Sequence, residues 1–283
     1  MTMRSIPSTI TSGRFLVFGC IVPKHKLDVS AHMLPERVRV VAHRGASAYA
    51  PENTFAAFDK ALALGAHEAE LDVHLSRDGQ VVVIHDATVD RTTGGAGAVA
   101  SLTLAQLKAL DAGTWFSAEF AGQRIPTLDE VLERYRGRLH LHIELKPKIQ
   151  AVAGRVADLV RSHGMAESVT VISFHRGLIE HLREYAPEIP AGLLVQRADE
   201  ADARRAVAKG IRAFYARGAS LAADSIRHLR EQGLAVVAWD VQNEAEMRRL
   251  VAVGADGIIL DFPDKLVEYL RLTSNKQERA ATT

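Results

Sequence analysis

The chain has 283 residues, of which 47% are hydrophobic and 24% are charged, a composition typical of globular proteins. Its 35 basic and 34 acidic residues give a formal net charge of +1, which argues against the basic footprint of a nucleic-acid-binding domain. The one cysteine, Cys20, excludes an intramolecular disulfide, and no apolar run approaches the ~20 residues of a transmembrane helix. We therefore expect a cytoplasmic protein with no nucleic-acid partner and no transmembrane segment.

The two ends of the chain are expected to lie outside the folded part. Residues 1–36 precede the first predicted strand, and we interpret them as a poorly ordered extension. They include an apolar run at 15–22 that resembles the apolar part of a signal peptide. However, Phe18 stands where a lipoprotein cleavage site at Cys20 would carry a small residue, so export is the weaker interpretation. The polar residues 273–283 are expected to form a frayed tail.

From residue 37 to residue 272, β-branched runs alternate with amphipathic segments. The predicted strands lie at 38–42, 68–73, 139–145, 168–173, 191–195, 212–215, 234–239 and 257–260. The predicted helices lie at 53–64, 152–163, 178–185, 200–209, 220–231 and 243–253. Asn53 is the expected N-cap of the first helix, and Gly65 is its expected C-terminal stop.

Strands that are joined by helical crossovers form parallel sheets. Eight such units match the size of a (β/α)₈ barrel of the TIM type, an α/β fold that typically has ~250 residues. The alternative is an open doubly wound sheet. That fold is disfavoured because the sequence shows no glycine-rich phosphate loop after the first strand.

An additional strand at 81–85 interrupts this alternation. Only the residues 76–79 separate it from the strand before it, and four residues cannot form a parallel crossover. The two strands must therefore form an antiparallel hairpin with its turn at Asp78-Gly79. The numbers of paired residues should then sum to about 156, which places His85 opposite Leu71.

The segment 87–126, which follows the hairpin, is rich in glycine and threonine and contains one short helical pattern at 104–110. We interpret this segment as a small insertion over the barrel mouth, where substrate-shaping elements are common. It carries three aromatic residues, Trp115, Phe116 and Phe120, which suit either a small polar substrate or a lipid.

The predicted topology brings seven charged or titratable residues to one mouth, because reactive groups of such barrels gather at the carboxyl ends of the strands. These residues are His43, Arg44, Glu70, Asp72, His85, Glu144 and Lys146. Glu70 and Asp72 lie two residues apart on one strand, so their side chains share a face. The same alternation places Glu144 and Lys146 on the polar face of the strand at 139–145.

This combination of residues indicates phosphodiester chemistry at a metal ion. Burying three carboxylates without partners costs several kcal/mol per ion, so we expect Glu70, Asp72 and Glu144 to bind one hard divalent cation, Mg²⁺ or Ca²⁺. Arg44 as a bidentate fork and Lys146 as a point charge suit a phosphate group.

His43 and His85 complete this predicted site. Imidazole side chains are the usual groups for proton exchange near neutral pH, so these residues can serve an attacking oxygen and a leaving oxygen. Asp86 either orients His85 or caps the following turn, and the sequence does not separate these alternatives. Which histidine acts as acid, and whether water or a hydroxyl group of the substrate itself attacks, also stay open.

The ordered set of motifs resembles the glycerophosphodiester phosphodiesterase family, in its bacterial single-domain type, from about residue 37 to residue 270. The matching segments are Val41-Ala42-His43-Arg44-Gly45, Pro51-Glu52-Asn53-Thr54, Glu70-Leu71-Asp72-Val73, Ile84-His85-Asp86, Ile143-Glu144-Leu145-Lys146, Ser173-Phe174, the strand with Trp239, and Leu260-Asp261-Phe262-Pro263-Asp264. The resemblance implies that the two histidines are the acid/base pair, that the three carboxylates bind the metal, and that Arg44 and Lys146 contact phosphate.

Two further residues are predicted to bind the substrate. Trp239 ends a strand, so its amphipathic ring can contact the glycerol moiety, and Glu52 is expected to form hydrogen bonds at the mouth. This sequence departs from the family pattern at His142, where an asparagine is usual, and at Asp240 and Leu260, where a threonine is usual. We expect His142 to act as a hydrogen-bond partner behind the site and His140 to be structural.

The predicted function is hydrolysis of glycerophosphodiesters to sn-glycerol 3-phosphate and an alcohol. One alternative is phospholipase D-like hydrolysis of lysophospholipids, which shares the barrel and hairpin but calls for an apolar entrance. The other alternative is a non-catalytic phosphate-binding barrel, which would require a gap in the constellation of site residues. The sequence does not determine the headgroup preference or the oligomeric state, a homodimer included.

Overall fold

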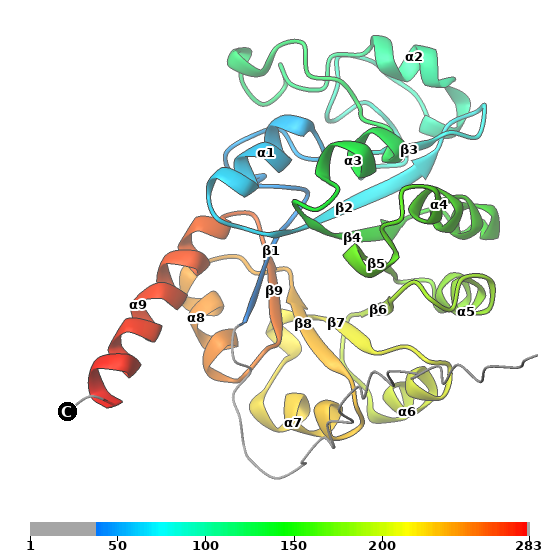
Figure 1. Cartoon of the computed structure of the whole chain (residues 1–283). Coiled ribbons are helices and arrows are strands. Elements are labelled where there is room, and N and C mark those ends of the chain that lie inside the picture. The colour runs from blue at the N-terminus through cyan, green and yellow to red at the C-terminus, as the bar shows by residue number, and fades with distance from the viewer. Residues whose placement is uncertain (1–37, 282–283) are drawn as a thin grey trace, which may run out of the picture. The chain divides into compact units, whose positions relative to one another are not determined.

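Eight parallel strands close into a barrel in the computed structural model of the protein, which describes residues 38–281 (Figure 1). The strands of the ring are β1 (Arg39–Ala42), β2 (Glu68–Leu75), β4 (His140–Leu145), β5 (Val169–Ser173), β6 (Ala191–Val195), β7 (Ala213–Arg217), β8 (Ala235–Trp239) and β9 (Gly257–Leu260). Strand β1 pairs with β9 on one side and with β2 on the other, which closes the ring. The predicted barrel is confirmed, whereas the expectations for residues 1–36 and Cys20 lie outside the described residues.

Helices cover the outside of the ring (Figure 1). They are α1 (Phe55–Ala63), α3 (Leu128–Tyr135), α4 (Gln150–Ser162), α5 (Arg176–Tyr185), α6 (Glu200–Ala208), α7 (Ala223–Glu231), α8 (Glu244–Ala252) and α9 (Pro263–Ala281). Short 3₁₀ turns occur at η1 (Val99–Ser101), η2 (Ala118–Phe120), η3 (Ala166–Ser168) and η4 (Gly218–Ser220). None of the helices within the described residues is both long enough and apolar enough to cross a membrane.

Two helical segments differ from the sequence-based expectation. Helix α3 was not predicted, although Thr127 and Glu130 form a capping box at its start, which is a recognisable helix signal. Helix α9 continues to Ala281 and so includes polar residues that we expected to form a frayed tail.

The predicted hairpin is present, and its register is confirmed. Strand β3 (Val81–Val83) pairs antiparallel with the carboxyl end of β2, and Val83 lies opposite Val73. Since β3 bonds to β2 outside the ring, the hairpin extends beyond the barrel mouth. Strand β3 is shorter than predicted, but the Ile84 amide still donates to the Asp72 carbonyl over 3.0 Å. This bond fixes the chain just before His85.

The insertion after the hairpin has a small apolar core of its own, which includes helix α2 (Leu104–Ala109). The buried residues of this core are Val82, Ile84, Val89, Val99, Leu107, Ala112 and Ile125. Two of them, Val82 and Ile84, belong to the hairpin, so the insertion packs directly against the elements that carry His85. The insertion is therefore anchored beside the site through buried apolar contacts.

The loop after β1 corrects one prediction. The N-cap of α1 is Thr54, whose side chain accepts a hydrogen bond from the Ala57 amide. Asn53 has a left-handed backbone with φ 58°, which is not an N-cap conformation. Its side-chain amide instead donates to Asp72 Oδ2 over 2.8 Å, and its Oδ1 accepts from the Asp72 amide over 3.3 Å. Asn53 therefore ties the loop to β2.

Gly45 in this loop is expected to be intolerant of alanine. Its φ is +81°, and an added Cβ would lie 2.5 Å from the Ala57 carbonyl carbon. Gly233 is a matched control, because its φ is +83° but an added Cβ would meet nothing within 4 Å. We expect Gly233→Ala to cost about 1–2 kcal/mol of unfolding free energy from backbone strain alone. Gly45→Ala should cost ~1–3 kcal/mol more because of the overlap, as measured by urea unfolding. Equal losses in the two variants would contradict this account of the loop.

Candidate active site

Three buried carboxylates form the centre of the candidate site. Asp72 on β2 lies directly opposite Glu144 on β4 in the parallel ladder, and Glu70 lies two residues before Asp72 on the same face. The exposed fractions of these residues are 3% for Glu70, 1% for Asp72 and 7% for Glu144. One carboxylate oxygen from each lies within 4.8 Å of the others, a spacing that can hold a metal ion.

The negative charges of this cluster are only partly balanced by the neighbouring basic side chains. Burial, together with the charges of Asp72 and Glu144, raises the pKa of Glu70 well above its usual value. Burial and the charge of Asp72 raise the pKa of Glu144 to about 7. Burial by itself would raise the pKa of Asp72, but the positive charges of Lys146 and Arg44 have the larger effect and lower this pKa. Oxygen ligands that are buried and short of cations are a good fit for a hard divalent ion.

Two basic side chains stand next to the carboxylates. Lys146 Nζ lies 2.9 Å from Glu144 Oε2 and 3.0 Å from Asp72 Oδ1. Arg44 Nε lies 3.3 Å from Asp72 Oδ2, and the Arg44 backbone amide donates to Glu70 Oε2 over 3.1 Å. Because both side chains also line the pocket above the cluster, a phosphate group in that pocket would meet both charges.

His43 lies at the end of β1 and is held by a carboxylate from the far end of the chain. Its Nδ1 is 2.6 Å from Asp261 Oδ1, just beyond the end of β9. Asp261 Oδ1 also accepts a hydrogen bond of 2.9 Å from the Ser47 hydroxyl. Burial opposes the charge of Asp261, but the bond from His43 outweighs it and lowers the pKa of Asp261. An ionised Asp261 fixes the ring, with Nδ1 toward the carboxylate.

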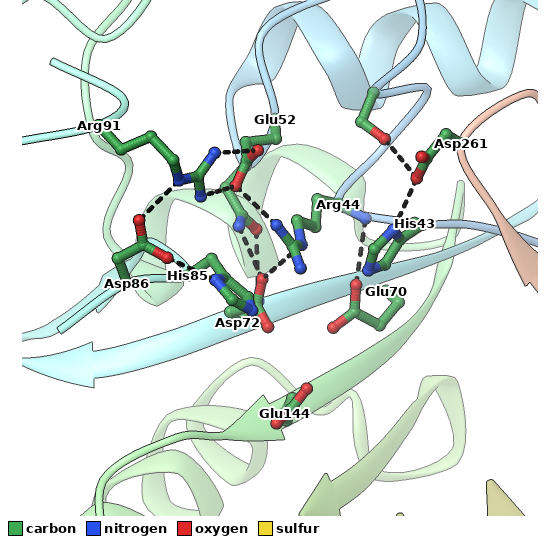
Figure 2. A network of polar contacts seen from close by, with 12 residues as sticks. His43, Arg44, Glu52, Glu70, Asp72, His85, Asp86, Arg91, Glu144 and Asp261 are labelled. Carbon is green, nitrogen blue, oxygen red and sulfur yellow. Dashed lines mark hydrogen bonds and ion pairs between the residues drawn. The ribbon is translucent and has the colours of Figure 1, made fainter. Parts of the chain in front are cut away.

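His85 has an equivalent arrangement on the other side of the carboxylates. Its Nδ1 lies 2.7 Å from Asp86 Oδ1, and its ring lies beside Asp72 (Figure 2). Burial lowers the pKa of His85, although the charge of Asp72 acts in the opposite direction. The structure thus selects the orienting role among the two alternatives for Asp86. His85 also lines the same pocket as Glu70.

Glu52 is not among the residues that line this pocket. Its Oε1 accepts a hydrogen bond of 2.9 Å from Arg44, and both its oxygens accept hydrogen bonds of 2.8 Å from Arg91 (Figure 2). Burial opposes the charge of Glu52, but the hydrogen bond from Arg91 and the charge of Arg44 outweigh it and lower the pKa of Glu52. Glu52 therefore sits behind Arg44 as an anionic support.

The opposite wall of the pocket is aromatic and aliphatic. Trp239 at the end of β8 and Phe174 meet edge to face, with ring centroids 5.4 Å apart. The Trp239 indole donates to the Tyr215 carbonyl over 3.0 Å, which fixes the ring. The aliphatic residues of this wall are Ile172, Leu194 and Ile259. Apart from Asp240, which also lines the pocket, a ligand would therefore meet apolar side chains here and charged side chains from β1, β2 and β4.

His142 and His140 lie in the barrel interior beneath the site. The completely buried His142 contacts the Tyr215 hydroxyl and Glu68 Oε2, each at 2.7 Å. His140 Nε2 lies 2.9 Å from the Thr170 hydroxyl. Both histidines belong to a buried hydrogen-bond network outside the residues that line the pocket.

Comparison with known proteins decides which family has this arrangement. The sequence pattern of the glycerophosphoryl diester phosphodiesterase family matches residues 43–265. The chain belongs to this family. Membership makes the protein a hydrolase, and every site residue described above falls within the matched range.

Individual members of the family match most of the chain. A glycerophosphodiester phosphodiesterase from Caldanaerobacter subterraneus subsp. tengcongensis is 38% identical, over 82% of this chain and 97% of that protein. The solved glycerophosphodiester phosphodiesterase from Agrobacterium tumefaciens is 35% identical, with a TM-score of 0.73 over 81% of this chain and 99% of that one. A phosphodiesterase from Oleispira antarctica, solved in complex with the product sn-glycerol-3-phosphate, is 29% identical, with a TM-score of 0.76 over 81% and 95%.

Some residues that support this phosphodiesterase site were missed by sequence reasoning. Asp261 had no predicted role, although its position after the last strand places it beside the first strand of any closed barrel. Arg91 lies in the irregular insertion, where no periodicity shows the direction of its side chain. Asn53 was interpreted as a helix cap, because asparagine is common at both caps and left-handed positions.

Proposed function

We propose that the protein is a metal-dependent phosphodiesterase that hydrolyses glycerophosphodiesters to sn-glycerol 3-phosphate and an alcohol. The observation that carries the proposal is that two carboxylate-held histidines share one pocket with Glu70 and Glu144 of the carboxylate cluster and with the two basic side chains. The relatives support the substrate class, since one is named a glycerophosphodiester phosphodiesterase and another contains sn-glycerol-3-phosphate.

The cation of this proposal is one Mg²⁺ or Ca²⁺ held by Glu70, Asp72 and Glu144. When bound, such an ion supplies Lewis-acid polarisation of a phosphoryl oxygen. Arg44 binds and orients the phosphate through its planar fork, and Lys146 contributes a point charge. Glu52 keeps the Arg44 guanidinium in place through the bond of 2.9 Å.

The two histidines supply the proton transfers of hydrolysis. Diester cleavage removes a proton from the attacking oxygen and delivers one to the leaving alcohol, so a base and an acid both assist it. In His43 and His85 the Nδ1 atom faces an aspartate, which leaves Nε2 as the atom that exchanges the proton. We propose that each histidine performs one of the two transfers.

The apolar wall of the pocket suits the carbon skeleton of glycerol. Trp239 and Phe174 are held at right angles to each other, with an interplanar angle of 87°, and both line the pocket. Aromatic faces of this kind bind CH groups while the hydroxyl groups face polar atoms. We propose that these rings position the glycerol moiety relative to the phosphate.

A substrate panel tests this proposal. Purified protein with Mg²⁺ or Ca²⁺ is expected to hydrolyse glycerophosphocholine and glycerophosphoethanolamine faster than lysophosphatidylcholine, as measured by release of the free alcohol. Faster turnover of lysophosphatidylcholine would favour the phospholipase D-like alternative, for which the exposed ring of Trp115 provides an apolar surface. If no diester is cleaved with either metal, the enzymatic proposal fails and the non-catalytic alternative is favoured.

A further inference from the structure

The insertion contributes one side chain, Arg91, to the network around the site (Figure 2). Arg91 Nε donates to Asp86 Oδ2 over 2.6 Å. The two terminal nitrogens donate to Glu52 Oε2 and Oε1, each over 2.8 Å. One guanidinium therefore uses all three of its nitrogens to hold two carboxylates side by side.

Each of these carboxylates holds a residue that lines the pocket. Asp86 contacts Nδ1 of His85 at 2.7 Å, and Glu52 accepts from Arg44 over 2.9 Å. Arg91 itself is not among the residues that line the pocket. It acts on His85 and on Arg44 through one intermediary each.

The backbone of Arg91 is fixed on both sides by the insertion. Val89 before it is completely buried, and Thr92 and Thr93 after it are each 7% exposed. The Thr93 hydroxyl donates to the Val89 carbonyl over 2.7 Å, which closes the turn around Arg91. The apolar core of the insertion thus determines where the guanidinium stands.

We infer that Arg91 is a positioning residue, through which the insertion fixes the orientation of both the proton-transferring His85 and the phosphate-binding Arg44. This inference rests on the proposed function of those two residues. Without the guanidinium, the neighbouring carboxylates of Glu52 and Asp86 repel each other, and each side chain is free to rotate. The two active groups then spend less time in their productive orientations.

The expected effect of Arg91→Gln is a fall in kcat/KM on glycerophosphocholine of ~10–100-fold, which is usual when a residue that orients an active-site group is lost. We expect kcat to fall because His85 is less well oriented, and KM to rise because Arg44 is less well oriented. Arg91→Lys should recover little activity, because an ammonium group cannot bridge two carboxylates as a fork does. Stabilisation by Mg²⁺ or Ca²⁺ should persist in both variants, because Arg91 touches none of the three carboxylates of the metal cluster.

A matched control is Arg134→Gln. Arg134 in α3 forms an ion pair of 2.6 Å with Asp59 and has a side chain 47% exposed, against 44% for Arg91. Its kinetic constants should match those of the wild type. In addition, the fall in kcat/KM of the combined variant Arg91→Gln/Asp86→Asn should be smaller than the product of the two single-variant falls. Both changes act on His85 through the same contact between Arg91 and Asp86.

The inference would be overturned by wild-type kcat and KM in both Arg91 variants. It would also be overturned if the falls in kcat/KM multiply fully when Arg91→Gln is combined with Asp86→Asn and with Glu52→Gln. Loss of thermal stability in Arg91→Gln without any kinetic change in a folded Arg91→Lys would also overturn it, since that result marks a purely structural role. If the wild-type protein itself cleaves no glycerophosphodiester, the proposed function fails and this inference fails with it.

Discussion

Replacing either His43 or His85 by alanine is expected to lower kcat on glycerophosphocholine by ~10²–10⁴-fold, the range that general acid or base catalysis usually contributes. Each histidine is part of a separate dyad, with Asp261 and with Asp86, so neither can take over the proton transfer of the other. KM should change less than kcat, because the phosphate contacts of Arg44 and Lys146 stay in place. Steady-state kinetics measure both constants.

His228→Ala serves as the control for these variants. His228 is exposed on α7, its Nδ1 lies 2.8 Å from the Asp224 carbonyl, and it is not among the residues that line the pocket. We expect wild-type kinetics from this variant. The two active-site variants should still be stabilised by the divalent cation, which would show that the metal cluster survives. Wild-type kcat in either His43→Ala or His85→Ala would contradict the two-histidine mechanism.

Two isosteric changes in the carboxylate cluster are expected to alter stability in opposite directions when no metal is present. Asp72 pairs with Lys146 and Arg44, so Asp72→Asn takes from each of these partly buried cations one of its two anionic partners. Breaking a buried pair in this way typically costs about 3–5 kcal/mol. Glu70 is the contrasting case, because burial and its carboxylate neighbours raise its pKa and its negative charge opposes folding. Glu70→Gln should stabilise the metal-free protein by about 1–2 kcal/mol, as other changes that relieve active-site strain do.

The sign of the Glu70 effect follows from proton linkage. A carboxyl group whose pKa is raised in the folded state, as that of Glu70 is, favours folding while it is protonated. It disfavours folding once the pH rises above the pKa that the group has in the unfolded state. At neutral pH in EDTA, removing this charge therefore stabilises the protein. Adding Mg²⁺ or Ca²⁺ should raise the unfolding temperature of the wild type more than that of either variant. Stability changes of the same sign in Glu70→Gln and Asp72→Asn would contradict the proposed electrostatics.

Much of the fold could be predicted because local constraints determine it. The alternation of strands and helices indicates parallel crossovers, and a connection of four residues between two strands allows only an antiparallel hairpin. The register of that hairpin follows from its turn, and Val83 indeed lies opposite Val73. The positions of Glu70, Asp72 and Glu144 follow from strand alternation in the same way.

The supporting contacts could not be predicted in this way, because they depend on three-dimensional proximity. His43 and Asp261 meet across 218 positions of sequence, and only closure of the ring brings them together. Arg91 reaches Glu52 across 39 positions from an irregular segment, where no period gives the direction of a side chain. Asn53 fitted a cap pattern, but its left-handed backbone turns its side chain toward Asp72 instead.

The most direct test of the account is to identify the products formed from glycerophosphocholine. We predict that the enzyme releases choline and sn-glycerol 3-phosphate in equal amounts, that EDTA stops the reaction, and that Mg²⁺ or Ca²⁺ restores it. This result would show that the bond between phosphate and the headgroup alcohol is cleaved and that a divalent cation is needed. Release of phosphocholine and glycerol, or full activity in EDTA, would contradict it.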